Sequence, residues 1–67
     1  MTNTILLKDA MERNGLELKD IAEQLEISTD SLHRKIQNKK EFKGSEIGAL
    51  VDILHLSSKE IKEIFFE

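Results

Sequence analysis

The sequence contains no cysteine, proline, tryptophan or tyrosine, and it has only three glycines and three phenylalanines. Without cysteine, the chain can form neither a disulfide nor a thiolate metal site. The absence of proline and the small number of glycines remove the residues that most often interrupt a helix. An all-α chain held together by close helix packing is therefore favoured, and the 39% of apolar residues suffice for its core.

Long apolar runs are also missing, because no segment of the 67 residues approaches the length needed to cross a bilayer. The first residues, MTNTILLK, lack the basic region and the long apolar region of a signal peptide. No linker, internal repeat or low-complexity tract divides the chain. We therefore expect one cytoplasmic domain, residues 1–67, which buries only about 60% of its unfolded surface and has no membrane partner.

Catalytic motifs are absent as well. The sequence has no HExxH zinc motif, no glycine-rich phosphate loop and no cysteine nucleophile. Its two histidines, His33 and His55, are far apart in the chain and fall on different predicted helices. We interpret His55 as a helix-end residue that suits the helix dipole. The sequence therefore predicts no enzymatic activity, cofactor, metal or small-molecule substrate.

What the sequence does contain is a stretch, residues 18–40, that predicts two helices joined by a very short turn. Its first apolar residues follow the i, i+3, i+4, i+7 spacing of an amphipathic helix: Leu18, Ile21, Ala22 and Leu25. Ser28 then offers its side-chain oxygen as the N-cap of a second helix, predicted over residues 29–37. Only two residues lie between Leu25 and Ser28. The helices must therefore cross at a steep angle, as in a helix-turn-helix.

The polar face of the helix predicted over residues 29–37 is the part that suggests a partner. Its side chains fall within one arc of about 100°, on the roughly opposite side from Leu32 and Ile36. The arc consists of Asp30, His33, Arg34 and Gln37. Donors, acceptors and a guanidinium are the groups that read base edges in a major groove. The plain alternative is a solvated face with an Asp30–Arg34 pair worth a few tenths of a kcal/mol.

Charge is distributed unevenly along the chain, although its net value is −3. Residues 33–43 carry +4, whereas residues 1–32 carry −4 and residues 44–67 carry −3. Half of the ten basic residues lie in that central window: Arg34, Lys35, Lys39, Lys40 and Lys43. Such asymmetry indicates an anionic partner, with a merely solvated basic surface as the alternative.

Three further helices are predicted around this pair. The first is capped by Asn3 or Thr4 and ends at Gly15. The fourth opens at Gly44-Ser45-Glu46, and the fifth follows the Ser57–Glu60 capping box. Their core-facing residues are predicted to be Leu7, Ala10, Met11, Ile47, Leu50, Val51, Leu54, Ile61, Ile64 and Phe65.

The three phenylalanines each leave an alternative open. Phe42, in the basic loop, is interpreted as an anchor into the core, with stacking on single-stranded nucleic acid as the alternative. Phe65 and Phe66 lie about 100° apart around their helix, so one of them can face outward. An outward phenylalanine offers a partner surface, whereas folding back onto the first helix would bury it.

Taken together, these residues resemble the helix-turn-helix regulators of the lambda-repressor and Cro class, the XRE family. The resemblance spans nearly the whole chain and is carried by Leu16, Ile21, Ala22, Leu25, Ile27, Ser28, Leu32, Asn38 with the lysines after it, and residues 47–54. The 32–36 run and the final Ile64-Phe65-Phe66-Glu67 look similar to short regulators of temperate phages and prophages of Gram-positive bacteria. Leu18 stands where these regulators usually have Gln, and Glu26 stands where they usually have Gly.

The resemblance implies a five-helix lambda-repressor-like DNA-binding domain whose third helix enters the major groove. It implies a dimeric repressor-type or Cro-type transcription regulator, acting on double-stranded DNA at a palindromic operator in a bacterial or phage-infected cell. Base edges would be read by Thr29, Asp30, His33, Arg34 and Gln37. Phosphates would be bound by Ser28, Lys35, Asn38, Lys39, Lys40, Lys43, Gly44 and Ser45. The candidate dimer contacts are Phe65 and Phe66.

Two alternatives accompany this interpretation. Asp30 can accept a hydrogen bond from a cytosine amine, or it can cap the third helix, and capping is slightly favoured. The whole chain can instead be a protein-interaction module, antitoxin-like or anti-repressor-like, that keeps the fold without specific DNA binding. The overall acidity, Leu18, Glu26 and Asp30 favour that second interpretation.

Overall fold

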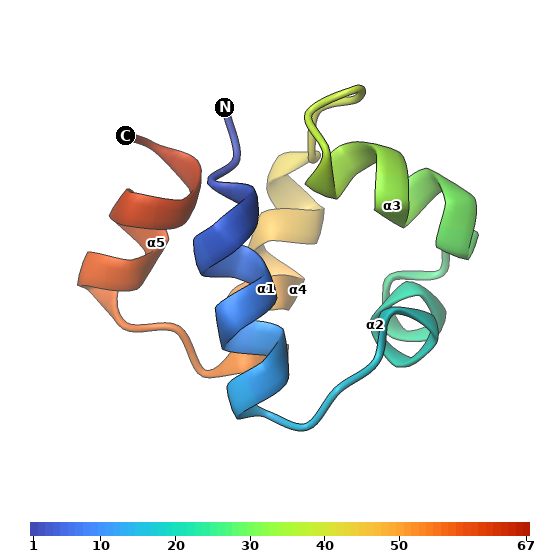
Figure 1. Cartoon of the computed structure of the whole chain (residues 1–67), viewed down its shortest axis with the longest axis horizontal. Helices are drawn as coiled ribbons and strands as arrows, with labels where there is room; N and C mark the ends of the chain where they lie inside the picture. The colour runs from blue at the N-terminus through green and yellow to red at the C-terminus, as the bar shows by residue number, and fades with distance from the viewer.

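The computed structural model describes all residues 1–67 and contains five helices and no strand (Figure 1). The helices are α1 (Thr4–Arg13), α2 (Leu18–Leu25), α3 (Thr29–Ile36), α4 (Gly44–Leu54) and α5 (Ser58–Phe65). The prediction of an all-α chain with five helices is confirmed, and the predicted bounds hold to within one or two residues. None of the helices combines the length and the apolar character that a membrane span requires.

The helices begin where short polar side chains satisfy their free amides. Asn3 caps α1 by accepting from the Leu6 N–H at 3.1 Å, so Asn3 rather than Thr4 is the cap. Ser28 caps α3 by accepting from the Ser31 N–H at 3.0 Å. The capping box predicted for α5 is present, with Ser57 accepting from the Glu60 N–H. These caps are local, which is why the sequence predicted them.

The first four helices end in the same way. A residue in the left-handed conformation follows each of them: Gly15, Glu26, Asn38 and His55, with φ of 63°, 58°, 64° and 52°. In each case the residue after the left-handed one donates its backbone N–H to the carbonyl five residues earlier in the chain, as in a Schellman motif. Glu26 adopts this conformation without being glycine, at a conformational cost. The bond from the Ile27 N–H to the Ala22 carbonyl, at 3.0 Å, closes the turn between α2 and α3 despite that cost.

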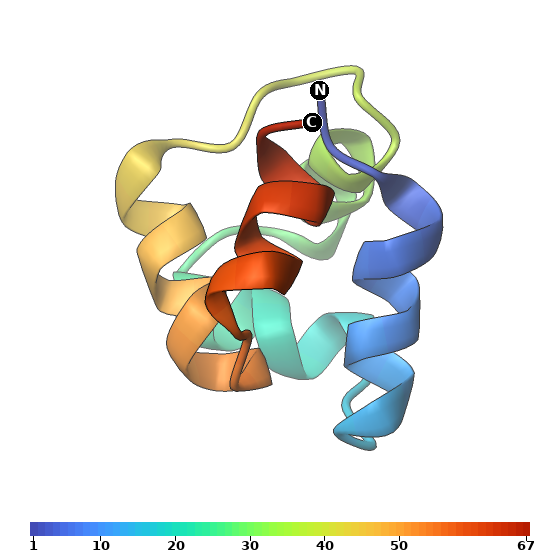
Figure 2. The ribbon, with the colours of Figure 1, turned by 90° about the vertical axis from the view of Figure 1, so that its left-hand side faces the viewer.

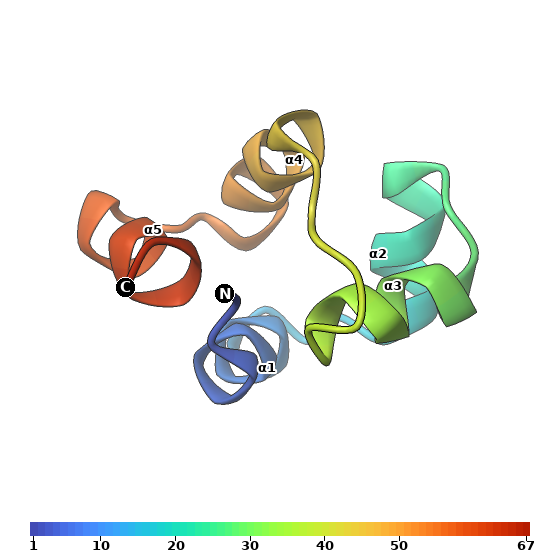
Figure 3. The ribbon, with the colours of Figure 1, turned by 90° about the horizontal axis from the view of Figure 1, so that it is seen from above.

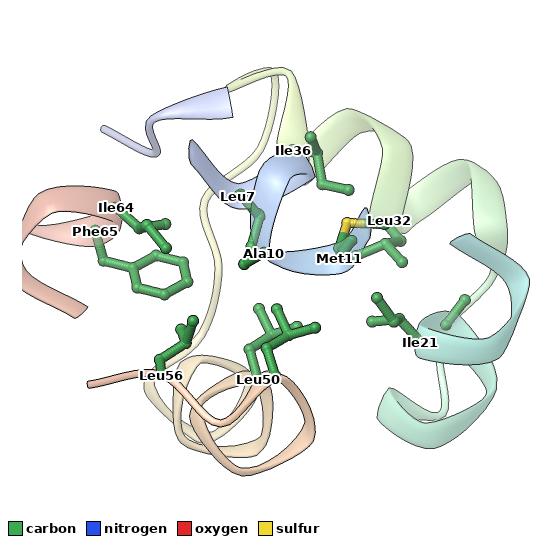
Figure 4. Close-up of a cluster of buried hydrophobic side chains, with 12 residues drawn as sticks. Leu7, Ala10, Met11, Ile21, Leu32, Ile36, Leu50, Leu56, Ile64 and Phe65 are labelled. Carbon is green, nitrogen blue, oxygen red and sulfur yellow. The ribbon is translucent and has the colours of Figure 1, made fainter. Parts of the chain in front are cut away.

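One continuous core joins all five helices. Figure 4 shows Leu7 of α1 and Leu50 of α4 at its centre, between Phe65 of α5 on one side and Ile21 of α2 on the other. The twelve buried apolar residues are Leu7, Ala10, Met11, Ile21, Ala22, Leu32, Ile36, Leu50, Leu54, Leu56, Ile64 and Phe65. Each fully buried aliphatic side chain stabilises the fold by about 1.5–3 kcal/mol.

The helices are arranged so that α3 and α5 lie on opposite sides of α1 and α4. Along the longest dimension of the molecule, α5 is at one end and the α2–α3 pair is at the other (Figures 1 and 3). In Figure 1, α2 is seen nearly end-on while α3 runs across the view, so the two helices cross steeply. The chain ends lie side by side (Figure 2), and the Asn3 N–H donates to the Ile64 carbonyl at 2.7 Å.

Candidate nucleic-acid interface

The residues predicted to read bases share the exposed face of α3. Thr29, Asp30, His33, Arg34 and Gln37 are all exposed. The opposite face of the helix is held in the core by Leu32 and Ile36, each 1% exposed. Because the apolar pair fixes the rotation of α3, the polar arc faces outward as the sequence predicted. The arrangement presents a guanidinium, an imidazole and an amide to any partner that approaches the helix.

Within that face, Arg34 is paired with Asp30. The Arg34 Nε lies 3.2 Å from the Asp30 Oδ2, and both side chains are more than half exposed. An exposed pair of this spacing is worth only a few tenths of a kcal/mol, so a ligand with a stronger acceptor can displace it. The preference for Asp30 as the helix cap was wrong, because Ser28 caps α3. Asp30 instead places a carboxylate on the polar face, in the first turn of α3.

The basic loop, residues 37–43, follows α3 and leads to α4 (Figure 3). Lys39, Lys40 and Lys43 are exposed, and so are Gly44 and Ser45 in the first turn of α4. The loop is anchored near its C-terminal end by Phe42, which is half-buried. Its ring packs edge-to-face on the ring of Phe65, with the centroids 5.9 Å apart. The interpretation of Phe42 as a core anchor is confirmed, and the lysines are presented from an anchored loop.

Lys35 does not belong to this surface, so its predicted phosphate contact was wrong. The residue is 5% exposed, and its Nζ donates to both carboxylate oxygens of Glu46, at 2.7 and 2.6 Å. The physical reason is its direction, because Lys35 lies about 100° beyond Arg34 around α3, outside the polar arc. At that angle it meets the first turn of α4 instead of solvent.

Opposing influences act on the Glu46 carboxylate. Burial raises its pKa, whereas hydrogen bonds from Lys35 and from the Lys43 N–H, the latter at 2.8 Å, lower it. The positive charges of the two lysines also lower it, and the net result is a pKa below the ordinary value. Glu46 is therefore charged at neutral pH and neutralises Lys35. The positive field of the window 33–43 is weaker by one charge than the sequence suggested.

Asn38 and Ser28, two further predicted phosphate ligands, are already engaged within the protein. The Asn38 side chain accepts from the Thr2 N–H and donates to the Thr2 carbonyl, both at 2.8 Å. Thr4 adds a bond from its hydroxyl to the Ile36 carbonyl at 2.6 Å. The Ser28 hydroxyl oxygen accepts from α3, which leaves its proton free to donate. The sequence did not predict these contacts of Thr2 and Thr4, because their partners are more than 30 residues away.

The two phenylalanines proposed as dimer contacts differ in exposure. Phe65 is 6% exposed and packs against Phe42, so its assignment to an interface was wrong. Phe66 is 68% exposed. Ile5 of α1, at 79%, is another exposed large apolar residue. The two residues lie on α1 and at the end of α5, which pack against each other.

Neither histidine lies in a cleft. The two hollows on the surface are lined by residues of the chain ends, the 38–42 loop, α1, α4 and α5, and neither includes His33 or His55. No group of three or more histidine or acidic side chains comes together in a way that could hold a metal ion. Comparison with protein-family models, with curated proteins and with solved structures finds no match to this chain.

Proposed function

We propose that this protein is a sequence-specific double-stranded DNA-binding transcription regulator of the lambda-repressor and Cro kind. The observation that supports this most is the exposed polar face of α3, flanked by three exposed lysines on an anchored loop. The steep crossing of α2 and α3 across a three-residue turn is the geometry of a helix-turn-helix. In this proposal, α3 is the recognition helix.

Base recognition follows from the chemistry of the α3 face. A major groove about 12 Å wide admits a helix, and a guanidinium can bind the O6 and N7 of guanine together. We assign this role to Arg34, whose guanidinium would leave Asp30 when it binds the base. Gln37 is suited to adenine, and Thr29 and His33 lie on the same exposed surface. These contacts would supply sequence discrimination.

Phosphate contacts would supply register and most of the affinity. We assign them to Lys39, Lys40 and Lys43, together with the amide end of α4 at Gly44 and Ser45. Three lysine contacts predict a slope of about −3 for the logarithm of affinity against the logarithm of salt concentration, per monomer. Lys35 is excluded because Glu46 neutralises it.

A second copy would bind the other half of a palindromic site, with half-site centres one helical turn, about 34 Å, apart. The exposed Phe66 and Ile5 are the side chains we assign to the contact between copies. Phe66 lies at the end of α5, which α1 separates from α3 (Figure 1), whereas Ile5 lies in the first turn of α1, where the Thr4 hydroxyl donates to the Ile36 carbonyl of α3. A contact between copies centred on Phe66, at the end of α5, would leave α3 of each copy free to bind DNA.

The experiment that tests the proposal is selection of bound sequences from a random duplex pool. We expect a palindromic site to be enriched, and Arg34→Ala to weaken binding to it by about 10- to 100-fold, because one bidentate base contact is lost. Circular dichroism must show that the variant is folded. Unchanged affinity in a folded Arg34→Ala protein would contradict the assigned reading face.

A second function, that of a protein-interaction module, is favoured by different observations. The net charge is −3, and the large apolar side chains of Met1, Ile5 and Phe66 are exposed. In that case the α1–α5 side would be the working surface. No enrichment of any duplex at a low salt concentration of about 50 mM, together with a tight complex to another protein, would select this function over DNA binding.

A further inference from the structure

Lys35 and Glu46 are the only buried charged residues in the protein, 5% and 7% exposed. Their contact is complete, because the ammonium donates to both carboxylate oxygens, at 2.7 and 2.6 Å. The same carboxylate also accepts from the N–H of Lys43, at 2.8 Å, where α4 begins. No buried side-chain nitrogen or oxygen in the molecule lacks a partner. One carboxylate therefore ties together α3, the end of the basic loop and the first turn of α4.

Stability alone does not explain a buried ion pair at this place. Removing two charges from water costs about as much as their attraction returns, and apolar residues of similar volume often stabilise a fold equally well. An apolar contact, however, tolerates sliding and rotation, whereas hydrogen bonds between an ammonium and a carboxylate fix a distance and a direction. What the pair contributes beyond packing is the placement of α3 relative to α4.

That placement matters for the surface next to it. Lys35 immediately follows Arg34 on α3, and Glu46 follows Gly44 and Ser45 at the start of α4. A rotation of α3 by about 10° would move a side chain lying about 6 Å from the helix axis by about 1 Å. Hydrogen bonds to base edges tolerate only a few tenths of an ångström. Small changes at the Lys35–Glu46 contact would therefore displace the reading face relative to the loop lysines.

We propose that Lys35 and Glu46 are a positioning pair that sets the reading face of α3 against the phosphate-binding loop, without touching DNA themselves. This inference rests on the proposed function, because it assigns the two residues to the same DNA-binding surface. The role of Lys35 in this proposal differs from the phosphate contact that its position among the basic residues 33–43 suggested. The Lys35 ammonium is neutralised by Glu46 and does not attract the duplex. Its contact with Glu46 instead aligns the side chains that bind DNA.

The test is the double variant Lys35→Met/Glu46→Met, which keeps the net charge at −3 and replaces the pair by flexible apolar side chains. We expect a folded protein whose affinity for the selected duplex falls at least about tenfold, a loss of about 1.4 kcal/mol. The ratio of affinities for selected and scrambled duplex should fall too. The salt slope should not change, since Lys39, Lys40 and Lys43 remain. A purely structural pair would move the melting temperature and leave these ratios unchanged.

The matched control is Arg13→Met/Glu60→Gln, which removes the ion pair between α1 and α5, also without changing net charge. The glutamine keeps an acceptor for the Ser57 N–H. This variant should bind the duplex as the wild type does. If the Met/Met variant unfolds, Glu46→Gln replaces it, because its amide oxygen still accepts from the Lys43 N–H. Wild-type affinity and discrimination in whichever variant is folded would overturn the positioning role. Failure of the wild type to bind any duplex would instead overturn the proposed function.

Discussion

Two ion pairs join different helices of this protein, and they lie in opposite surroundings. Lys35 and Glu46 connect α3 to α4 with both side chains less than 10% exposed. Arg13 and Glu60 connect α1 to α5 with side chains 57% and 27% exposed. Water competes for the groups of the second pair, so that pair contributes little and tolerates movement. No solvent competes for the groups of the first pair. That pair must make all of its hydrogen bonds to offset the free-energy cost of removing two charges from water.

The comparison also separates two ends of the molecule. The α3–α4 end carries the basic loop and the polar face, and its geometry is held by a buried carboxylate. The α1–α5 end carries Ile5 and Phe66 and is held by an exposed pair and a backbone bond between the chain ends. The reading surface proposed for α3 would require fixed geometry, whereas the proposed apolar contact between copies would not. The two kinds of ion pair match these two requirements.

The largest effect should come from breaking the buried pair on one side only. Glu46→Met leaves the Lys35 ammonium buried without a partner, and we expect it to lower the free energy of unfolding by about 3–5 kcal/mol. Arg13→Met, in the exposed pair, should change it far less. Thermal unfolding followed by circular dichroism measures both. The Lys35→Met/Glu46→Met protein should be much more stable than Glu46→Met, because the two changes are coupled. Equal losses at the two ion pairs would remove the contrast between them.

These contacts also show which features of the structure could be predicted from the sequence. Helix limits were predictable because their signals are local, as with Ser28 three residues before the amide it binds, or Gly15 two residues after the end of α1. The direction of the α3 face followed from helical periodicity. Lys35 was misassigned because its partner is eleven residues away, on a helix whose placement depends on the whole core. Periodicity did place Phe65 in the core, but the ring of Phe42 that packs on it lies 23 residues earlier in the chain and could not be paired with it from the sequence.

The functional assignment has a different limit. An exposed arc of polar residues on a helix is common to solvated surfaces and to recognition helices, and composition does not distinguish them. The features that favour recognition here are combinations across elements, such as the α3 face with the anchored loop lysines. Such combinations were predictable only through the resemblance to a known helix arrangement.

Acid should weaken both ends of the molecule through their carboxylates. Burial raises the pKa of Glu46, but the bonds and charges of Lys35 and Lys43 lower it by more. The bond from the Ser57 N–H, followed by that from Arg13, lowers the pKa of Glu60. For both groups the folded value lies below the ordinary 4.5, so their stabilisation is complete above that pH. It is lost as the pH falls from about 4.5 through the folded values.

This dependence is measured as the melting temperature between pH 7 and pH 3. In Glu46→Gln and in Glu60→Gln the decline in acid should be shallower than in the wild type, since one linked carboxylate is gone. Glu23→Gln, at an exposed position outside every ion pair, is the control for a simple change of charge. An acid decline in Glu46→Gln as steep as that of the wild type would show that this carboxylate has no such linkage.

The smallest effect on stability, and the most informative for recognition, is expected at Asp30. Asp30→Asn removes an exposed i, i+4 pair worth only a few tenths of a kcal/mol, so the melting temperature should hardly move. It also removes a negative charge from a face proposed to approach phosphates, and it frees Arg34. Affinity should therefore rise for scrambled duplex more than for the selected site, which lowers discrimination.

Asp52→Asn, which makes the same charge change at an exposed position on α4, is the matched control. Both affinities are measured by fluorescence anisotropy at one salt concentration. Equal gains in the two variants would mean that Asp30 acts only through net charge, whereas a gain confined to Asp30→Asn would place it on the surface that meets the duplex.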